Sequence, residues 1–421
     1  MKYKIDIKVV RNIMNNEVRV MLKREVYLSK IRPFYESDLI KVLVGIRRAG
    51  KSTIMTQIIE ELKEKGVSEK QIIYINFEYK EYSFIKNDDD LYDYIKSLIK
   101  NDSKYYLFLD EIQNVDKWEK AVNSFKAKEK YSIFITGSNS DLLSSELATR
   151  IAGRYVSFKI YPFSFSEVCD LKNLKDKNKY ELREYFDDYI KWGGLPQRFE
   201  FNNEIQIKTY LSDVYDSIVV KDIIERFGIK DLDLFNRIVE YIVTTPSEIF
   251  SAETLANYFL GKEERSVAKN TLYNYLEYMV KSNLINKCER YDIRGKRILS
   301  GKYKYYLTDL GLGFIKNINR KPQLGAYLEN IVYNELLTRD YEVSVGSVKE
   351  GKIDFIATKN NSIEYYQVTY SLATDEVIDR EFRVYKNIND NYPKYVISTD
   401  TFDMSQNGVI HKNIVDWLLK K

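Results

Sequence analysis

At 421 residues the chain is too long for one ordinary hydrophobic core, and one domain per roughly 100 to 200 residues predicts two to four modules. Hydrophobic residues make up 44% and charged residues 30%, which excludes a largely disordered chain. The sequence has neither an apolar run of the roughly 18 residues that a spanning helix needs nor a signal-peptide pattern, so we expect a cytoplasmic protein with no membrane partner. The net charge of +4 is too small to indicate a nucleic-acid binder by itself.

Cysteine and histidine are scarce. Only Cys169, Cys288 and His411 occur, and they lie far apart in the sequence. This excludes a disulfide scaffold, a Cys/His zinc site and a histidine-based catalytic triad.

The N-terminal half predicts an α/β fold. Residues 1–36 read as a helical segment that ends at Pro33, because proline breaks a helix. Short β-branched runs then alternate with helical patterns, which indicates a parallel sheet with helices on both faces over residues 37–162. We expect strands at residues 40–45, 72–75, 105–110, 133–136 and 155–160.

The rest of the chain predicts three further modules. Residues 163–249 are mainly helical and form a plausible lid. Residues 250–320 read as a helix-turn-helix followed by a hairpin, and residues 321–421 as a final α/β module with a hairpin turn at Asn360-Asn361.

A glycine-rich loop follows the first expected strand. The spacing G-x-x-x-x-G-K-S lets backbone N–H groups curl around phosphates at a helix N-terminus. Lys51 would reach the β and γ phosphates of ATP, and the Ser52 hydroxyl would bind Mg²⁺. The predicted nucleotide-binding residues are Gly45, Ile46, Arg47, Arg48, Ala49, Gly50, Lys51, Ser52 and Thr53.

Two acids end the third expected strand. Asp110 would hold the magnesium water shell, and Glu111 would polarise a water for in-line attack on the γ phosphate. Taken alone, such a pair equally well caps a strand. The strand, loop and helix upstream favour the catalytic interpretation.

Polar and basic residues lie near the ends of the later strands. Ser138 or Asn139 would sense the γ phosphate, although either also suits a helix N-cap. Arg150 or Arg154 would act as an arginine finger at the phosphate of a neighbouring subunit, and the sequence leaves open which one does.

These residues resemble the AAA-type ATPases of archaea and bacteria that carry a C-terminal domain of unknown function. The resemblance covers nearly the whole chain. Besides the loop and the acid pair, it is carried by residues 27–34, Ile135-Thr136-Gly137-Ser138-Asn139, residues 162–167 and Gly193-Gly194-Leu195-Pro196. It implies an AAA core with a helical lid, a winged helix and a tail similar to restriction endonucleases, together with homo-oligomer formation. It also implies a place for the Gly-Leu-Pro string near the nucleotide base, and a lid arginine for which Arg198 is the candidate.

Residues 251–320 hold 13 Lys or Arg against 7 Asp or Glu, a net charge of +6. A winged helix could therefore meet DNA, although such modules also pack against proteins. The candidate DNA-contacting residues are Lys269, Tyr273, Asn274, Arg294, Lys296 and Arg297.

The spacing of Glu329, Asp354 and Gln367 resembles the magnesium-holding set of restriction-like nucleases. Thr369 stands where those nucleases place a lysine, so we expect a degenerate tail used for docking.

The leading hypothesis is an ATPase that acts on DNA or on a DNA-bound partner. The rival is a slow nucleotide-dependent switch that binds a protein, and a third alternative makes the tail an ATP-gated nuclease.

Overall fold

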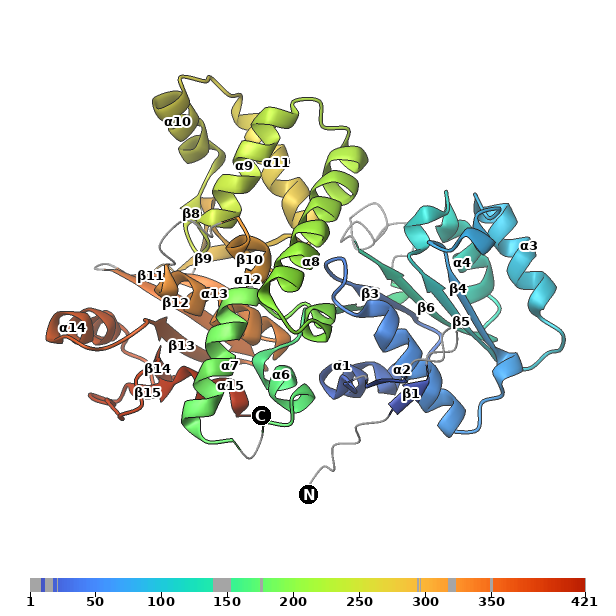
Figure 1. The fold of residues 1–421 in the computed structure, drawn as a ribbon, viewed down its shortest axis with the longest axis horizontal. Coiled ribbons are helices and arrows are strands. Elements are labelled where there is room, and N and C mark those ends of the chain that lie inside the picture. Colours follow the sequence, from blue (N-terminus) through green and yellow to red (C-terminus); the bar gives the residue numbers. More distant parts are fainter. Residues whose placement is uncertain are drawn as a thin grey trace. The chain divides into compact units, whose positions relative to one another are not determined.

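The computed structural model describes residues 9–11, 18–20, 22–138, 153–174, 177–293, 295, 297–316, 323–348 and 351–420. They belong to two compact units, Met1–Ile160 and Tyr161–Lys421 (Figure 1). Each unit has its own sheet, and each is described by itself.

The N-terminal segment contains two short strands as well as a helix. The prediction that residues 1–36 form a helical segment is therefore wrong for residues 9–11 and 18–20. Strands β1 (Val9–Arg11) and β2 (Val18–Val20) pair antiparallel, and helix α1 (Glu25–Ile31) follows. The two strands are rich in valine, whose branched side chain favours extended backbone over helix. Pro33 lies in the 3₁₀ turn Arg32–Phe34, directly after the point where α1 ends.

The first unit is built on a five-stranded parallel sheet in the order β4-β5-β6-β3-β7. Its strands are β3 (Ile40–Val44), β4 (Ile72–Asn76), β5 (Tyr105–Asp110), β6 (Tyr131–Gly137) and β7 (Tyr155–Lys159). The helices between them are α2 (Lys51–Glu64), α3 (Asp88–Leu98) and α4 (Trp118–Lys126). This confirms the predicted α/β fold class of the core.

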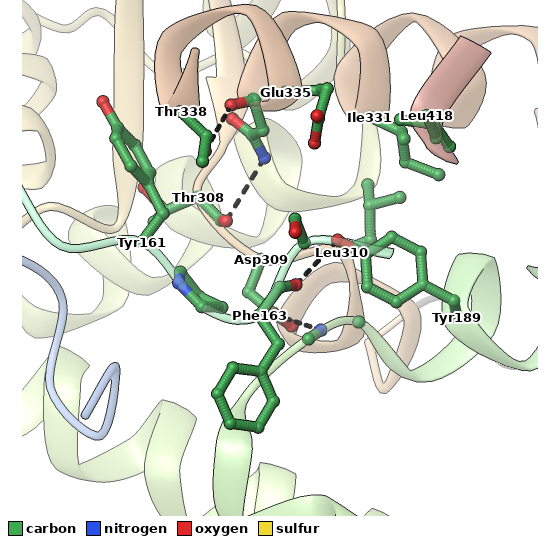
Figure 2. Close-up of a pocket in the computed structure, with 15 residues that line it drawn as sticks. Tyr161, Phe163, Tyr189, Thr308, Asp309, Leu310, Ile331, Glu335, Thr338 and Leu418 are labelled. Carbon is green, nitrogen blue, oxygen red and sulfur yellow. Dashed lines mark hydrogen bonds between the residues drawn. The ribbon is translucent and has the colours of Figure 1, made fainter. Parts of the chain in front are cut away.

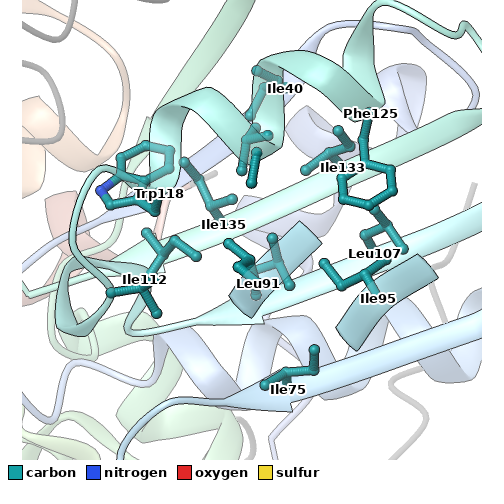
Figure 3. Close-up of a cluster of buried hydrophobic side chains, with 14 of the residues drawn as sticks. Ile40, Ile75, Leu91, Ile95, Leu107, Ile112, Trp118, Phe125, Ile133 and Ile135 are labelled. Atoms are coloured by element: carbon teal, nitrogen blue, oxygen red, sulfur yellow. The ribbon is translucent and has the colours of Figure 1, made fainter. Parts of the chain in front are cut away.

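Strands β3, β5 and β6 are buried along their whole length, as expected for a parallel sheet covered on both faces. One face packs against α3 and α4 in a cluster that includes Leu91, Leu107, Phe125 and Ile135 (Figure 3). Alternate strand residues must point to the other face. The parallel arrangement brings the carboxyl ends of β3, β5 and β6 to one edge of the sheet, where the glycine-rich loop begins.

The second unit begins with helices. They are α6 (Phe165–Leu171), α7 (Lys179–Trp192), α8 (Glu204–Ser217) with its π-helical continuation Ile218–Glu225, and α9 (Leu232–Thr244). Strand β8 (Ile249–Phe250), α10 (Ala252–Glu263), α11 (Lys269–Lys281), β9 (Ile285–Asp292) and β10 (Arg297–Leu307) follow.

The remaining elements complete the second unit. They are α12 (Leu310–Phe314), α13 (Leu324–Thr338), β11 (Glu342–Val348), β12 (Gly351–Lys359), β13 (Ser362–Val368), α14 (Asp375–Arg383), β14 (Lys394–Ser398), β15 (Ile410–Asn413) and α15 (Ile414–Leu419). The predicted turn at Asn360-Asn361 joins β12 to β13, and both asparagines have positive φ, as a tight hairpin requires.

One eight-stranded mixed sheet runs through this unit in the order β15-β14-β13-β12-β11-β9-β10-β8 (Figure 1). Strand β9 pairs antiparallel with β10 and parallel with β11. The hairpin predicted for residues 250–320 and the module predicted for residues 321–421 therefore share a single sheet. The boundary between them at residue 320 stays a prediction, and residues 317–322 lie outside the described part of the chain.

Candidate nucleotide site

The glycine-rich loop connects β3 to α2. At two of its positions the backbone geometry leaves no room for a side chain or strains any residue that has one. A Cβ at position 45 would lie 2.1 Å from the backbone oxygen of Ile160, so only glycine fits there. Gly50 is the N-cap of α2 and has φ +95°, which strains any residue with a side chain. The loop therefore turns tightly into a helix N-terminus, whose partial positive charge favours an anion.

Lys51 folds back over this loop. Its Nζ donates to the backbone oxygens of Gly45 (3.1 Å) and Ile46 (3.3 Å) and lies 3.7 Å from Oε1 of Glu111. The structure thus brings together Lys51 and Glu111, which are 60 positions apart in the chain. The side chain of Lys51 is only 4% exposed, so its charge acts in a weakly screened environment.

The other loop residues surround the helix start. Ile46 and Ala49 are buried, and Arg48 is exposed with φ +68°. Arg47 donates to Oε1 of Glu78 at 3.2 Å. The predicted phosphate and magnesium residues Ser52 and Thr53 lie half-buried in the first turn of α2, and their roles stay predictions.

Asp110 is completely buried at the end of β5, and three side chains donate to its carboxylate. Tyr74 donates to Oδ2 at 2.7 Å, Asn76 donates to Oδ2 at 3.2 Å, and the Thr136 hydroxyl donates to Oδ1. Burial of the phenol and, after it, the charge of Asp110 raise the pKa of Tyr74 well above its ordinary value. Asp110 is therefore held in one orientation by neighbouring strands.

The donor set fits magnesium. Ser52 and Asp110 offer a hydroxyl and a carboxylate, the oxygen ligands that Mg²⁺ prefers, and this ion usually completes its shell with phosphate oxygens and water. Within the described ranges no group of three or more His, Cys, Asp or Glu side chains could hold a metal ion.

Glu111 follows in the left-handed region, with φ +54°. Its backbone N–H donates to Oγ1 of Thr136 at 2.9 Å, and Nε2 of Gln113 donates to its Oε2 at 2.6 Å. Burial raises the pKa of Glu111, but Lys51, Gln113, Arg47 and the N–H of Ser138 together outweigh burial and hold that pKa below its ordinary value. Glu111 is therefore an ionised carboxylate at neutral pH.

The predicted sensor and finger residues are only partly within the described chain. Ser138 is buried after β6, and its N–H donates to the Glu111 carboxylate. Asn139 and Arg150 lie outside the described residues. Arg154 is exposed just before β7, and its backbone oxygen accepts from the N–H of Ile40 at 2.9 Å.

Sequence reasoning missed several residues of this site. Tyr74, Asn76 and Thr136 orient Asp110, and Gln113 orients Glu111. Two of these residues could have been predicted from the sequence. Asn76 and Thr136 are polar residues at the carboxyl ends of β4 and β6, the strands that flank β5.

Arg24 was also missed. It is 1% exposed, and its Nη1 donates to the backbone oxygen of Ala49 at 2.9 Å. The side chain of Gln57 ties the same segment to α2, since Oε1 accepts from the N–H of Arg24 and Nε2 donates to the oxygen of Leu22. The segment before α1 thus supports the loop from behind.

In the second unit, the Gly193-Gly194 string is held by Asp309. The Asp309 carboxylate accepts from the N–H groups of Gly194 (2.7 Å) and Gly311 (2.9 Å), and a Cβ at position 193 would lie 2.0 Å from it. Burial raises the pKa of Asp309 to about 6. The adjoining cavity measures about 30 Å³, room for about one water (Figure 2).

Arg198, the candidate lid arginine, is buried within the same unit. It donates to the backbone oxygen of Gly193 at 2.7 Å and to Asp188 at 2.9 Å. These bonds hold the string after α7. A role for Arg198 at a nucleotide stays a prediction.

The candidate DNA-contacting residues lie on α11 and β10. Lys269, Tyr273 and Asn274 are exposed on α11, and Arg297 is exposed at the start of β10. The side chain of Lys269 pairs with Glu253 at 2.7 Å. Arg294 and Lys296 lie outside the described residues.

The tail residues form a buried ionic cluster with a lysine from another strand. Lys304 of β10 pairs with Glu329 of α13, and Tyr306 donates to the same carboxylate at 2.5 Å. Burial and the charge of Asp354 raise the pKa of Glu329 to about 7. Gln367 accepts from the N–H of Asp354 at 2.7 Å, so it contacts that residue through backbone.

Comparison with protein families gives two matches. A model described as an AAA domain matches residues 37–169, and a model described as a domain of unknown function (DUF8612) matches residues 183–319. No helix in the described part of the chain is long and apolar enough to cross a membrane.

Two relatives cover most of the chain. An uncharacterized protein of Haemophilus influenzae is 35% identical over 409 residues, which span 96% of this chain and 100% of the relative. The uncharacterized protein MJ1544 of Methanocaldococcus jannaschii is 31% identical over 361 residues, 82% of this chain and 78% of the relative.

Solved structures resemble the chain weakly. Cdc6p from Pyrobaculum aerophilum is 13% identical, with a TM-score of 0.29, over 73% of this chain and 93% of that one. AMPPCP-bound DnaA from Aquifex aeolicus is 15% identical, with a TM-score of 0.27, over 61% and 87%. Scores of this size carry no argument about function.

Proposed function

The chain belongs to the AAA-type ATPases that carry a further C-terminal domain of unknown function, and we propose that it binds ATP with Mg²⁺ at the loop and hydrolyses it. One observation carries the proposal: Nζ of Lys51 lies 3.7 Å from Oε1 of Glu111. Glu111 is the residue that follows the buried Asp110 in the chain. An ammonium that can neutralise charge on a phosphate and a carboxylate that can accept a proton from water are two groups that support phosphoryl transfer to water.

Each residue has a distinct task in this proposal. The loop N–H groups and the start of α2 bind phosphates, and Lys51 neutralises charge that develops on them. Ser52 and Asp110 hold the magnesium, which would supply further charge neutralisation when bound. Glu111 accepts the proton of the attacking water, and Ser138 or Asn139 contacts the γ phosphate. An arginine finger, Arg150 or Arg154, acts between copies of the chain in a homo-oligomer.

We further propose that the ATP cycle moves the modules of the second unit on DNA. The support is chemical: residues 251–320 carry a net charge of +6, and α11 exposes Lys269, Tyr273 and Asn274 on one stretch of helix. The alternative is a slow switch that keeps its nucleotide and binds a protein partner.

The test is steady-state ATP hydrolysis with Mg²⁺ by the wild type and by Glu111→Gln, each with and without duplex DNA. Loss of the general base should lower kcat by roughly 10²- to 10⁴-fold. Acceleration of the wild type by DNA supports the DNA proposal. Negligible turnover, indifference to DNA and a nucleotide that stays bound would favour the switch instead.

We propose that the tail is used for docking rather than for cutting DNA. In support, Thr369 stands where restriction-like nucleases normally place a lysine, and the Glu329 carboxylate is already paired with Lys304. Magnesium-dependent DNA cleavage that Asp354→Ala abolishes would overturn this interpretation.

A further inference from the structure

Gln113 contacts the Glu111 carboxylate from a position two residues further along the chain. Its Nε2 lies 2.6 Å from Oε2 of Glu111, and an ionised carboxylate only accepts, so the amide nitrogen must face it. Both residues belong to one tight turn, in which the N–H of Asn114 donates to the oxygen of Glu111 at 3.2 Å. The pair is therefore a local feature with a fixed geometry.

This turn is locally unfavourable in two ways. Glu111 has φ +54°, a conformation that side-chain-bearing residues rarely adopt. The Oε1 atom of Gln113 is buried without a hydrogen-bond partner within the described ranges. A buried carbonyl oxygen normally finds a partner, so the donor bond to Glu111 is the hydrogen bond that the described residues give this side chain.

The other side-chain donor near Glu111 has a second task. Lys51 lies 3.7 Å from Oε1 of Glu111 and is also the residue that the proposed function assigns to phosphate. When its ammonium turns to a phosphate, the described contacts that still orient the carboxylate are the side chain of Gln113 and the N–H of Ser138. Gln113 is then the side chain that donates to Glu111 at hydrogen-bond distance among the described residues.

We infer that Gln113 is a positioning residue for ATP hydrolysis, holding the Glu111 carboxylate toward the attacking water. The inference rests on the proposed function. In the step concerned, the water oxygen bonds to the γ phosphorus, the bond from that phosphorus to the β–γ bridging oxygen breaks, and ADP leaves with the electron pair. The proton of the water goes to Glu111, so Gln113 acts only through Glu111.

The experiment compares kcat and KM for ATP in the wild type, Gln113→Met and Gln113→Glu. The methionine keeps the length of the side chain and removes the donor, so kcat should fall about 10-fold while KM stays within about twofold. Gln113→Glu puts a second carboxylate against Glu111 and should lower kcat further at neutral pH. Asn114→Met is the matched control, because Asn114 is exposed on the same turn, and it should behave as the wild type.

The split between kcat and KM separates positioning from general damage, because a damaged nucleotide site would also raise KM for ATP. A wild-type kcat in Gln113→Met would overturn the inference, as would a rise in KM as large as the fall in kcat in both Gln113 variants. Glu111→Gln tests the proposed function separately. If the wild type does not hydrolyse ATP, both the proposed function and the role of Gln113 fail. If Glu111→Gln loses activity but the Gln113 variants match the wild type, only the role of Gln113 fails.

Discussion

Lys41 lies in the strand that leads to the glycine-rich loop, and it gives a quantitative test of how this core is built. The residue is fully buried on β3, and its Nζ contacts Ser132 Oγ (2.8 Å), the oxygen of Ser37 (3.1 Å) and the face of the Phe134 ring (4.5 Å). Burial lowers the pKa of Lys41 from 10.5 to about 7. That displacement corresponds to roughly 5 kcal/mol against carrying the charge inside the core.

The sign of the pH dependence follows from the lowered pKa. Below about pH 7 the folded and unfolded states both carry the proton, so the folded state bears the full penalty. Between about pH 7 and pH 10.5 the unfolded state still holds a proton that the folded state has released, so the stability of the wild type rises with pH. Above that range the penalty is absent.

Lys41→Met keeps the apolar stem and removes the titrating group. The stability advantage of the variant over the wild type should therefore shrink by roughly 2.5 kcal/mol between about pH 6 and pH 9. Loss of the hydrogen bonds of the amine changes the free energy of unfolding of the variant by the same amount at about pH 6 and at about pH 9, so it does not affect this difference. Urea unfolding followed at Trp118, with Trp192 and Trp417 replaced by Phe, would report on the first unit alone.

A matched control is Lys120→Met on α4, where the lysine side chain is 65% exposed. Its stability relative to the wild type should not change over the same pH range. If the difference in free energy of unfolding between Lys41→Met and the wild type is also constant with pH, Lys41 is hydrated in the folded protein. The reasoning from burial is then refuted.

Two further variants test the architecture around the nucleotide. Gly45→Ala should lower ATP affinity by at least 10-fold in a calorimetric titration, because its Cβ would lie 2.1 Å from the oxygen of Ile160 and the loop must shift; an unchanged affinity would contradict this. Arg24→Ala leaves the buried oxygen of Ala49 without its donor, which costs roughly 1 to 3 kcal/mol, so both the stability of the first unit and ATP affinity should fall. Arg24→Lys, which keeps a donor, should fall between wild type and alanine, and equal affinities in all three would rule out a role for this contact.

The core was predictable because its signals are local. The β-branched runs, the spacing of the loop and the two acids after a buried strand each lie within a short stretch of sequence, and parallel strands must end at one edge. This logic placed Lys51, Asp110 and Ser138 around one point. The hairpin turn at Asn360-Asn361 was predictable for the same reason, since two adjacent asparagines tolerate positive φ.

What escaped prediction depends on register and on long-range contacts. Tyr74 and Asn76 donate to Asp110 only because β4 pairs with β5 so that Asn76 lies opposite Asp110. Lys304 enters the tail cluster from β10, a strand that sequence reasoning had assigned to another module. The parallel pairing of β9 with β11 depends on contacts between residues far apart in the sequence, and no local sequence pattern predicts it.

The surroundings of Glu111 suggest how nucleotide binding and hydrolysis are linked in the proposed function. Lys51 at present lies near both the loop oxygens and the Glu111 carboxylate, and it contributes to the low pKa of that carboxylate. A phosphate that draws the ammonium away removes this contribution, so Glu111 becomes a stronger base when substrate is bound. The same movement leaves its orientation to Gln113 and Ser138. Nucleotide binding would thus raise the basicity of Glu111 while the turn after β5 keeps its direction, so that one lysine couples the two events.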